Sequence, residues 1–335
     1  MPSNRLFQLF VFGAGASHAS GETPLGKDLV WDWYADCSTF LAIGSNGKPV
    51  AEAVEEDKKE FESFGQFLRF AQESYPALAD VYEQWQRAMR EGEHLILNIA
   101  KPYCIDEIME DLVRDQQAIQ HVKLIRKIAA AHIIGTSDIH TNSFYQRFTK
   151  SLKNKSGNDL AIISFNFDCL LRDDLENAIY FDHILEFEQI HSGRCFYKPG
   201  QGIPLLKLHG SLDWCYEPSS ETLTLLPAEW HKTYGGEPFV FLPHEIKHKK
   251  IGKLWDAAAS LISKADKITF VGYSLPDYDK DVQTLFGNNI RSGTEIVIVD
   301  SSPAVIERYK TLFPNMKVQG IECDLKSKTE EKVWF

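Results

Sequence analysis

The sequence predicts an α/β protein with a doubly wound parallel sheet that is interrupted by a helical insertion. Short apolar runs alternate with helical stretches near the start of the chain and again after residue 155. Residues 38–155 show helical spacing instead and contain no convincing strand. Because strands that alternate with helices indicate a parallel sheet covered on both faces, residues 1–37 and 156–335 are predicted to form one domain around the insertion.

The first predicted strand lies in residues 6–12, a compact apolar run. It ends abruptly at the small residues 13–17, a pattern typical of a buried strand that enters a tight phosphate-binding turn. Thr23 and Pro24 have the character of a helix N-cap and first helical residue, so we expect a helix to begin there.

The insertion is predicted from apolar residues that recur at helical spacing, punctuated by prolines and glycines. Such an aromatic-rich stripe is either the core of a helix bundle or an interface, and periodicity does not separate the two. The stripe includes Phe61, Phe64, Phe67, Tyr82 and Trp85.

The later strands are predicted from four short apolar runs, and helices lie between several of them. One helix is expected over residues 254–262 and another over residues 303–313, the latter capped by Ser302. The four runs are residues 160–165, 205–208, 268–271 and 296–299.

Composition narrows the class of protein. The 335 residues carry 36 Lys and Arg against 47 Asp and Glu, a formal net charge of −11. With 44% hydrophobic residues and a mean hydropathy of −0.26, the chain can bury a substantial core. The pI of 5.5 disfavours a generally basic nucleic-acid binder. No apolar run approaches the ~18 residues that span a bilayer, so no direct membrane association is expected.

The six cysteines lie far apart, and none is in a C-x-x-C pair that would hold zinc or exchange disulfides. We interpret them as reduced, mostly buried thiols of a cytoplasmic protein. The N-terminus mimics a secretory signal, since Arg5 precedes an apolar run. That run is short and is interrupted by Gln8, so we do not interpret it as a signal. The cysteines are Cys37, Cys104, Cys169, Cys195, Cys215 and Cys323.

Polar or glycine-rich segments follow five predicted strands. In open parallel sheets, ligands bind outside the carboxyl ends of the strands. Five such ends that converge on one edge predict a single site there. The segments are residues 13–17, 164–168, 207–210, 272–274 and 300–301.

The glycine turn and one acidic residue indicate a nucleotide. Gly13 and Gly15 allow backbone amides to approach a pyrophosphate at a helix N-terminus. His18 replaces the third glycine of the ordinary dinucleotide fingerprint, which weakens a dehydrogenase interpretation. Asp300 at a strand end suits ribose hydroxyls, and equally suits the cap of the next helix.

Asn166, Asp168 and His209 are the candidate catalytic residues. A neutral imidazole can take a proton from water or a sugar hydroxyl near neutral pH, while an amide and a carboxylate orient the ribose and its leaving group. The structural alternatives are a buried histidine bonded to a backbone carbonyl, and turn or cap chemistry for the other two.

Three segments together resemble the sirtuin-like NAD-binding family, whose fold is Rossmann-like: residues 13–17, 164–168 and 207–214. Residues 272–276, with Asp279 nearby, resemble the branch of prokaryotic antiphage-defence NAD hydrolases. The resemblance covers residues 1–30 and about 158–315.

The resemblance implies a role for each matched position. Asn166 and His209 would be catalytic at the nicotinamide ribose, and Asp168 would face the nicotinamide carboxamide. The glycine turn would hold the pyrophosphate, the later loop would line the phosphate and adenosine side, and an acidic strand end would bind the adenosine ribose. The implied cofactor-binding residues are Gly13, Ala14, Gly15, Ser17, Pro24, Gly272, Ser274 and Asp300.

The resemblance favours NAD+ hydrolysis to nicotinamide and ADP-ribose, in antiphage defence by NAD depletion. Protein-deacylating sirtuins carry a four-cysteine zinc module, which these cysteines do not supply, so no metal is expected. An NAD-dependent protein deacylase and a non-catalytic NAD or ADP-ribose sensor are the alternatives. Family precedent also implies homo-oligomers and co-encoded partners such as an ATPase.

A rival motif is H-E-x-x-H at residues 244–248. On a helix, His244 and His248 would lie on one face and bind zinc, with Glu245 as the base of a metalloprotease. Pro243 precedes the motif and the apolar helical pattern starts only near Leu254, so the structural context is weak.

Overall fold

The chain divides into two compact units in the computed structural model. One unit comprises residues 1–25 and 133–335, and the other comprises residues 26–132. All helices and strands given below lie in the first unit. The structure describes residues 6–21, 23, 25, 69, 109, 113, 122–123, 125–126, 129–130, 133, 143–152, 155, 159–171, 181–183, 203–217, 222–225, 237–242, 244–245 and 251–327.

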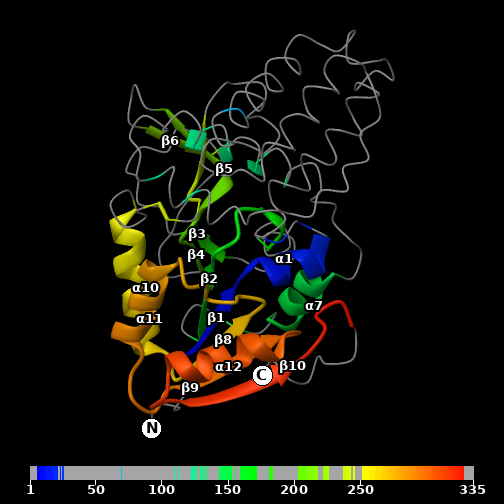
Figure 1. The fold of residues 1–335 in the computed structure, drawn as a ribbon, viewed down its shortest axis with the longest axis vertical. Coiled ribbons are helices and arrows are strands. Elements are labelled where there is room, and N and C mark those ends of the chain that lie inside the picture. The colour runs from blue at the N-terminus through cyan, green and yellow to red at the C-terminus, as the bar shows by residue number, and fades with distance from the viewer. Residues whose placement is uncertain are drawn as a thin grey trace. The chain divides into compact units, whose positions relative to one another are not determined.

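The first unit is built on a seven-stranded sheet of order β10-β9-β8-β1-β2-β4-β3, in which every neighbouring pair is parallel (Figure 1). The first strand of the chain is therefore central, and the sheet is wound outward from it in both directions. The strands are β1 (Gln8–Phe12), β2 (Leu160–Ser164), β3 (Phe181–His183), β4 (Ile203–Lys207), β8 (Lys267–Val271), β9 (Glu295–Asp300) and β10 (Lys317–Glu322).

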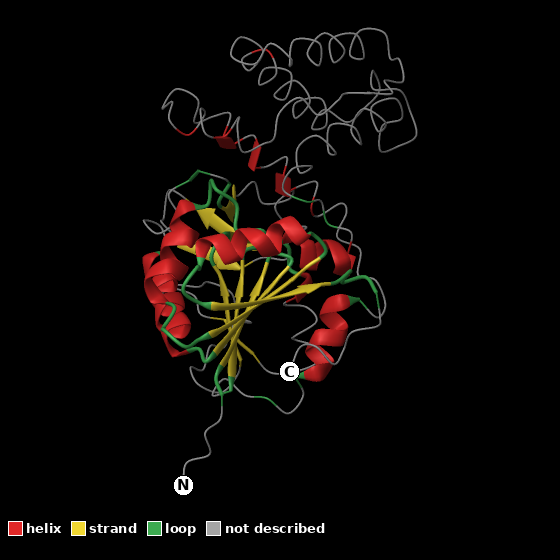
Figure 2. Cartoon of the chain, turned by 60° about the horizontal axis from the view of Figure 1, so that its bottom comes forward, coloured by secondary structure: helices red, strands yellow, loops and turns green. Residues whose placement is uncertain are grey.

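Helices cover both faces of this sheet (Figure 2). The side chains of β1 alternate between the two cores that these helices complete. Leu9 and Val11 pack in one core with α10 (Gly252–Lys264), α11 (Lys280–Asn289) and α12 (Pro303–Leu312). Phe10 and Phe12 pack in the other core with α1 (Ala14–Gly21) and α7 (Phe144–Ser151). The predicted doubly wound Rossmann-like fold is confirmed. None of the helices that the structure describes is long and apolar enough to cross a membrane.

Three strands of the unit form a second, antiparallel sheet that the sequence did not predict, with the order β6-β5-β7. These strands are β5 (Gly210–Glu217), β6 (Thr222–Leu225) and β7 (Glu237–Val240). β5 follows β4 after only Leu208 and His209, so the chain passes directly from one sheet to the other. β10 was also missed, because its residues are largely exposed and show no apolar run.

The first helix begins earlier than expected. α1 starts at Ala14, directly after β1, so residues 14–17 form its first turn rather than a separate loop. The helix predicted from Thr23 and Pro24 lies almost wholly outside the described residues, as does nearly all of the predicted insertion.

α7 belongs to the sheet unit, although the sequence prediction included it in the insertion of residues 38–155. Ser143 caps it, because its Oγ accepts a hydrogen bond from the Gln146 amide at 3.2 Å. The Phe148 ring packs edge-on against Phe10 and Phe12, with centroid distances of 5.0 and 4.9 Å. The helix therefore supplies part of the core on one face of the sheet.

Phe148→Ala should lower the free energy of unfolding by about 3–5 kcal/mol, because it leaves a cavity between α7 and β1. Lys150→Ala is the matched control: Lys150 is exposed on the same helix, and its loss should change stability by less than about 0.5 kcal/mol. Urea denaturation followed by tryptophan fluorescence measures both. Equal stability of the two variants would contradict the assignment of α7 to the sheet core.

Candidate functional site

The five predicted strand ends lie at one edge of the sheet. Phe12 at the end of β1 is level with Ser164 of β2 and with Val271 of β8. The ends of β4 and β9 continue this row, since Lys207 pairs with Ser164 and Val299 pairs with Val271. All these pairs are parallel, so the segments after them emerge on the same side.

The glycines after β1 and β8 allow two backbone segments to touch. A Cβ at Gly13 would lie 2.5 Å from the Cα of Tyr273, and one at Gly15 would lie 3.0 Å from the Cα of Gly272. Gly272 has a φ of 58°, and a Cβ there would lie 2.5 Å from the backbone nitrogen of Ala16. No side chain fits at this contact without displacing backbone atoms.

Backbone hydrogen bonds hold the same contact. The amide of Gly13 donates to the carbonyl of Val271 at 3.1 Å, and the amide of Gly15 donates to the carbonyl of Gly272 at 2.9 Å. The amide of Ala16 donates to the Gly13 carbonyl at 3.0 Å. These glycines therefore have a structural role in fixing the turn, and binding of a pyrophosphate by the turn remains a prediction.

Asn166 ties the end of β2 to the glycine turn. Its Nδ2 donates to the Gly13 carbonyl at 2.8 Å and lies 2.7 Å from the Ser17 Oγ and 3.0 Å from the Tyr145 hydroxyl. Because a carbonyl only accepts, these contacts identify Nδ2 and set the orientation of the amide. These contacts occupy the NH2 group, so Oδ1 is the acceptor that the amide can offer a ligand.

Tyr145 of α7 is a site residue that sequence reasoning missed. It is buried, its hydroxyl lies 3.0 Å from the Ser17 Oγ, and its amide donates to the Ser20 Oγ at 3.1 Å. The Ser17 hydroxyl, a predicted pyrophosphate ligand, is thus engaged inside the protein. An aromatic residue in a helical pattern carries no signal that would mark it as a partner of Asn166.

Asp168 is buried, and its Oδ1 accepts a hydrogen bond from the amide of Leu170 at 3.1 Å. This is the turn chemistry that the sequence offered as the structural alternative. The buried Lys207 ammonium donates to the Phe167 carbonyl at 3.2 Å and to the Asp168 carbonyl, and so fixes the backbone of this segment.

His209 lies at the junction of the two sheets. The next residue, Gly210, has a φ of 81°, and a Cβ there would lie 2.0 Å from the Phe239 carbonyl oxygen, so the turn after His209 requires glycine. The imidazole packs against the Phe165 ring, with a centroid distance of 4.8 Å. The backbone carbonyl of His209 accepts a hydrogen bond from the amide of Phe241 at 2.8 Å.

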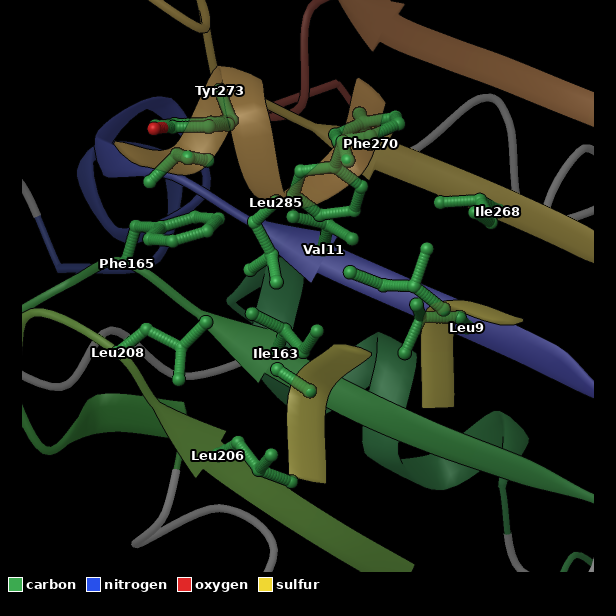
Figure 3. Packing of buried hydrophobic residues seen from close by; sticks show 14 of the residues in the cluster. Leu9, Val11, Ile163, Phe165, Leu206, Leu208, Ile268, Phe270, Tyr273 and Leu285 are labelled. Carbon is green, nitrogen blue, oxygen red and sulfur yellow. The ribbon is translucent and has the colours of Figure 1, made fainter. Parts of the chain in front are cut away.

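Phe165 connects His209 with the glycine turn through Tyr273. The rings of Phe165 and Tyr273 are stacked, with a centroid distance of 4.5 Å and an interplanar angle of 18°. Figure 3 shows Phe165, Tyr273 and Leu208 at the same end of the sheet, after β2, β8 and β4 respectively. The ring of His209 and the turn at Gly13 therefore border one aromatic pair.

Asp279 contacts both His209 and Tyr273. Its Oδ2 lies 3.1 Å from the Nε2 of His209, an ion-pair distance at which the ring N–H is not well aligned with the oxygen. The Tyr273 hydroxyl donates to the same Oδ2 at 2.6 Å. Burial raises the pKa of Tyr273 well above its ordinary value, and the Asp279 charge adds to the effect. The phenol therefore stays a donor.

The remaining predicted positions lie around this edge. Gly272 forms the contact described above, Ser274 is exposed on the following loop, and Ala14 opens α1. Pro24 lies outside the described residues. Asp300 ends β9, and its Oδ1 accepts from the amide of Ser302 at 2.8 Å. Ser302 itself occupies the N-cap position of α12 without a side-chain cap bond.

The zinc interpretation requires the H-E-x-x-H motif to lie on a helix, and the start of the motif does not. His244 has a φ of 63°, so it is not helical, and Glu245 also lies outside any helix. The Oε2 of Glu245 accepts a hydrogen bond from the amide of Leu242 at 2.7 Å. α10 begins only at Gly252. The motif therefore does not start on the helix that a metalloprotease of this type needs.

Gly13→Ala should lower the free energy of unfolding by about 1–3 kcal/mol, because its methyl group would overlap backbone atoms of the β8 loop. Gly287→Ala is a matched control with the opposite sign. Gly287 is exposed in α11 with nothing within 4 Å of its virtual Cβ, so alanine should stabilise the helix by about 0.5–1 kcal/mol. Chemical denaturation of both variants measures the difference. A neutral Gly13→Ala would contradict the close contact.

Asp300→Asn should stabilise the protein most at neutral pH. Burial raises the pKa of Asp300 in the folded protein, although the hydrogen bond from Ser302 opposes this. A raised carboxyl pKa contributes stability that is present below the unfolded pKa and is lost as pH rises through the folded pKa. The asparagine does not titrate and keeps an oxygen for Ser302, so its advantage should shrink as pH falls from neutrality toward about 4, the unfolded pKa of an aspartate. Unfolding curves across this range would contradict the expectation if the gap widened in acid.

Solved structures of Sir2 proteins are similar to this chain. A Sir2 homologue in complex with 2′-O-acetyl ADP-ribose is 14% identical over 96% of this chain and 87% of that chain, with a TM-score of 0.48. A Sir2 homologue in complex with NAD is 14% identical over 96% and 85% of the two chains, with a TM-score of 0.46. No protein-family model matches the chain, and no curated protein matches it. At this identity the likeness concerns the fold alone, which the strand order establishes independently.

Proposed function

We propose that this protein is an NAD+ hydrolase that cleaves the bond between nicotinamide and ribose, giving nicotinamide and ADP-ribose. The observation that supports this best is the junction at Asn166. Its amide is bonded to the glycine turn through Gly13, while the next residue back, Phe165, packs against His209. An amide bonded to a glycine turn of the kind that binds dinucleotides and an imidazole that packs on the adjacent residue thus meet at the end of β2.

The chemistry suits this small set of groups. The nicotinamide of NAD+ is cationic, so it leaves as a neutral base that keeps the electron pair of the broken bond. The general acid that ordinary glycosidases need for the leaving group is therefore unnecessary. Water forms the new bond to the ribose carbon and gives up one proton. The transition state resembles an oxocarbenium ion, which fixed polar groups stabilise.

Asn166 and His209 divide the work in this proposal. The NH2 of Asn166 is bonded within the protein, so its Oδ1 faces the substrate as an acceptor for a ribose hydroxyl or for water. Three neighbours hold the amide: Gly13, Ser17 and Tyr145. Little reorganisation is then needed during the reaction. His209 takes the proton from the hydroxyl or from water.

Hydrolysis is favoured over deacylation by the cysteines. A four-cysteine zinc module requires paired spacing, and none of the six cysteines lies in a C-x-x-C pair. These cysteines therefore do not supply the zinc module that would support a groove for an acylated lysine. Water is then the simplest acceptor of the ADP-ribosyl group.

The biological setting completes the proposal. Residues 272–276 with Asp279 resemble antiphage-defence NAD hydrolases, so we assign the activity to defence by NAD depletion in the cytoplasm. A homo-oligomer and a co-encoded partner such as an ATPase belong to the same proposal.

Purified protein incubated with NAD+ should release nicotinamide and ADP-ribose, which chromatography separates. His209→Ala and Asn166→Ala should each lower the rate by about 10²-fold or more, because each removes a group that acts on the ribose or water. Lys310→Ala should turn over NAD+ like the wild type, since Lys310 is an exposed residue of α12. Circular dichroism checks that each variant is folded.

One result would reject the hydrolase activity, and another would reject the roles assigned to His209 and Asn166. Wild-type protein that binds NAD+ without releasing nicotinamide would instead be a sensor. Unchanged turnover in both His209→Ala and Asn166→Ala would show that the reaction occurs elsewhere.

A further inference from the structure

Asp279 is a buried carboxylate whose position is not explained by helix formation. It occupies the N-cap position of α11, where an aspartate side chain ordinarily accepts a hydrogen bond from the first helical turn. Its side chain makes no such bond. The side chain is 1% exposed, and Oδ2 faces His209 and Tyr273 instead. A buried charge that gives up its cap requires another reason for its place.

Several contacts hold this carboxylate in place. Its own amide donates to the Pro276 carbonyl at 3.1 Å, and its carbonyl accepts from the Gln283 amide at 3.0 Å. Tyr273, which donates to Oδ2, is held in turn: its ring stacks on Phe165, and its carbonyl accepts from the Tyr309 hydroxyl at 2.8 Å. Oδ2 therefore has a nearly fixed position beside the imidazole.

The backbone of the loop supports the same arrangement. Leu275, between Tyr273 and Asp279, is buried and has a φ of 46°, which is strained for a residue with a branched side chain. Such strain persists where the surroundings fix the conformation. Here the strained residue shapes the loop that carries both Asp279 and its hydrogen-bond donor Tyr273.

We propose that Asp279, held by Tyr273, is a positioning residue that fixes the tautomer and orientation of His209; this rests on the proposed NAD+ hydrolysis. The negative charge of Oδ2 lies 3.1 Å from Nε2 and attracts an N–H group there, so it favours the neutral tautomer with the proton on Nε2 even without an aligned hydrogen bond. The lone pair then lies on Nδ1, which becomes the basic nitrogen of the imidazole.

The proton transfer follows from this tautomer. An O–H bond of water or of a ribose hydroxyl breaks, and the proton forms an N–H bond at Nδ1. The imidazolium that results is stabilised by the Asp279 carboxylate, which keeps its negative charge and takes no proton. Tyr273 remains a neutral donor to Oδ2 throughout. The arrangement is a general base, His209, with a carboxylate beside it that orients the imidazole.

Asp279→Asn tests the proposal with little change of shape. Tyr273 and Nε2 both face the position of Oδ2, so an amide with its NH2 group there donates to both, because the Tyr273 hydroxyl can also accept. Nε2 then becomes an acceptor, and the ring proton moves to Nδ1. The kcat for nicotinamide release should fall by about 10²-fold or more, whereas the KM for NAD+ should stay unchanged. Asp277→Asn is the matched control. Its carboxylate is on the same loop and 81% exposed, so turnover should be unaffected.

The tautomer is read directly from long-range proton–nitrogen NMR spectra of protein labelled with ¹⁵N-histidine. The signals of His209 are identified by their loss in His209→Ala. Wild type and Asp277→Asn should show the proton on Nε2, and Asp279→Asn should show it on Nδ1 or shared between the nitrogens. A proton that stays on Nε2 in Asp279→Asn would overturn the proposal whether or not the wild type hydrolyses NAD+.

Tyr273→Phe is the second variant, and it removes only the hydroxyl that holds Oδ2. We expect a smaller fall in kcat than in Asp279→Asn and a mixture of the two tautomers. It also serves if Asp279→Asn does not fold. Wild-type kcat together with a wild-type histidine spectrum in Tyr273→Phe would overturn the part assigned to Tyr273.

Discussion

The contact between the two glycine turns is the constraint on which the candidate site depends. The turn after β1 and the turn after β8 approach so closely that neither Gly13 nor Gly272 has room for a side chain. Hydrogen bonds from the amides of Gly13 and Gly15 to β8 and the start of its loop hold the contact. Asn166 is joined to these turns by a hydrogen bond to Gly13, and His209 is linked to them through the rings of Phe165 and Tyr273.

Two kinds of contact extend from the turns. On one side, polar bonds join Asn166, Ser17 and Tyr145, so that an amide in the core is oriented by partners on two helices, α1 and α7. On the other side, ring contacts join Tyr273, Phe165 and His209. Polar bonds set direction, and packed rings set distance. The combination orients the polar groups at the carboxyl ends of β1, β2 and β8.

The sequence was a good guide to the sheet and a partial guide to the site. Apolar runs predicted β1, β2, β8 and β9 because strands buried on both faces leave a continuous apolar pattern. β10 is largely exposed and leaves no such pattern, so it was missed. Tyr145 was missed for a related reason: helical periodicity reports which face of α7 is buried, but not that a hydroxyl on that face meets Asn166.

The sequence by itself determined the alternation of strands and helices and the convergence of polar strand ends, because both follow from periodicity and from the geometry of parallel sheets. Only the tertiary structure decided which groups pair at that edge. Residues 13 and 166 are far apart in the chain, as are residues 209 and 279, and no local pattern records that the atoms of each pair meet. Hydrogen bonds act over about 3 Å and depend on direction, so pairing is fixed only when the elements are packed.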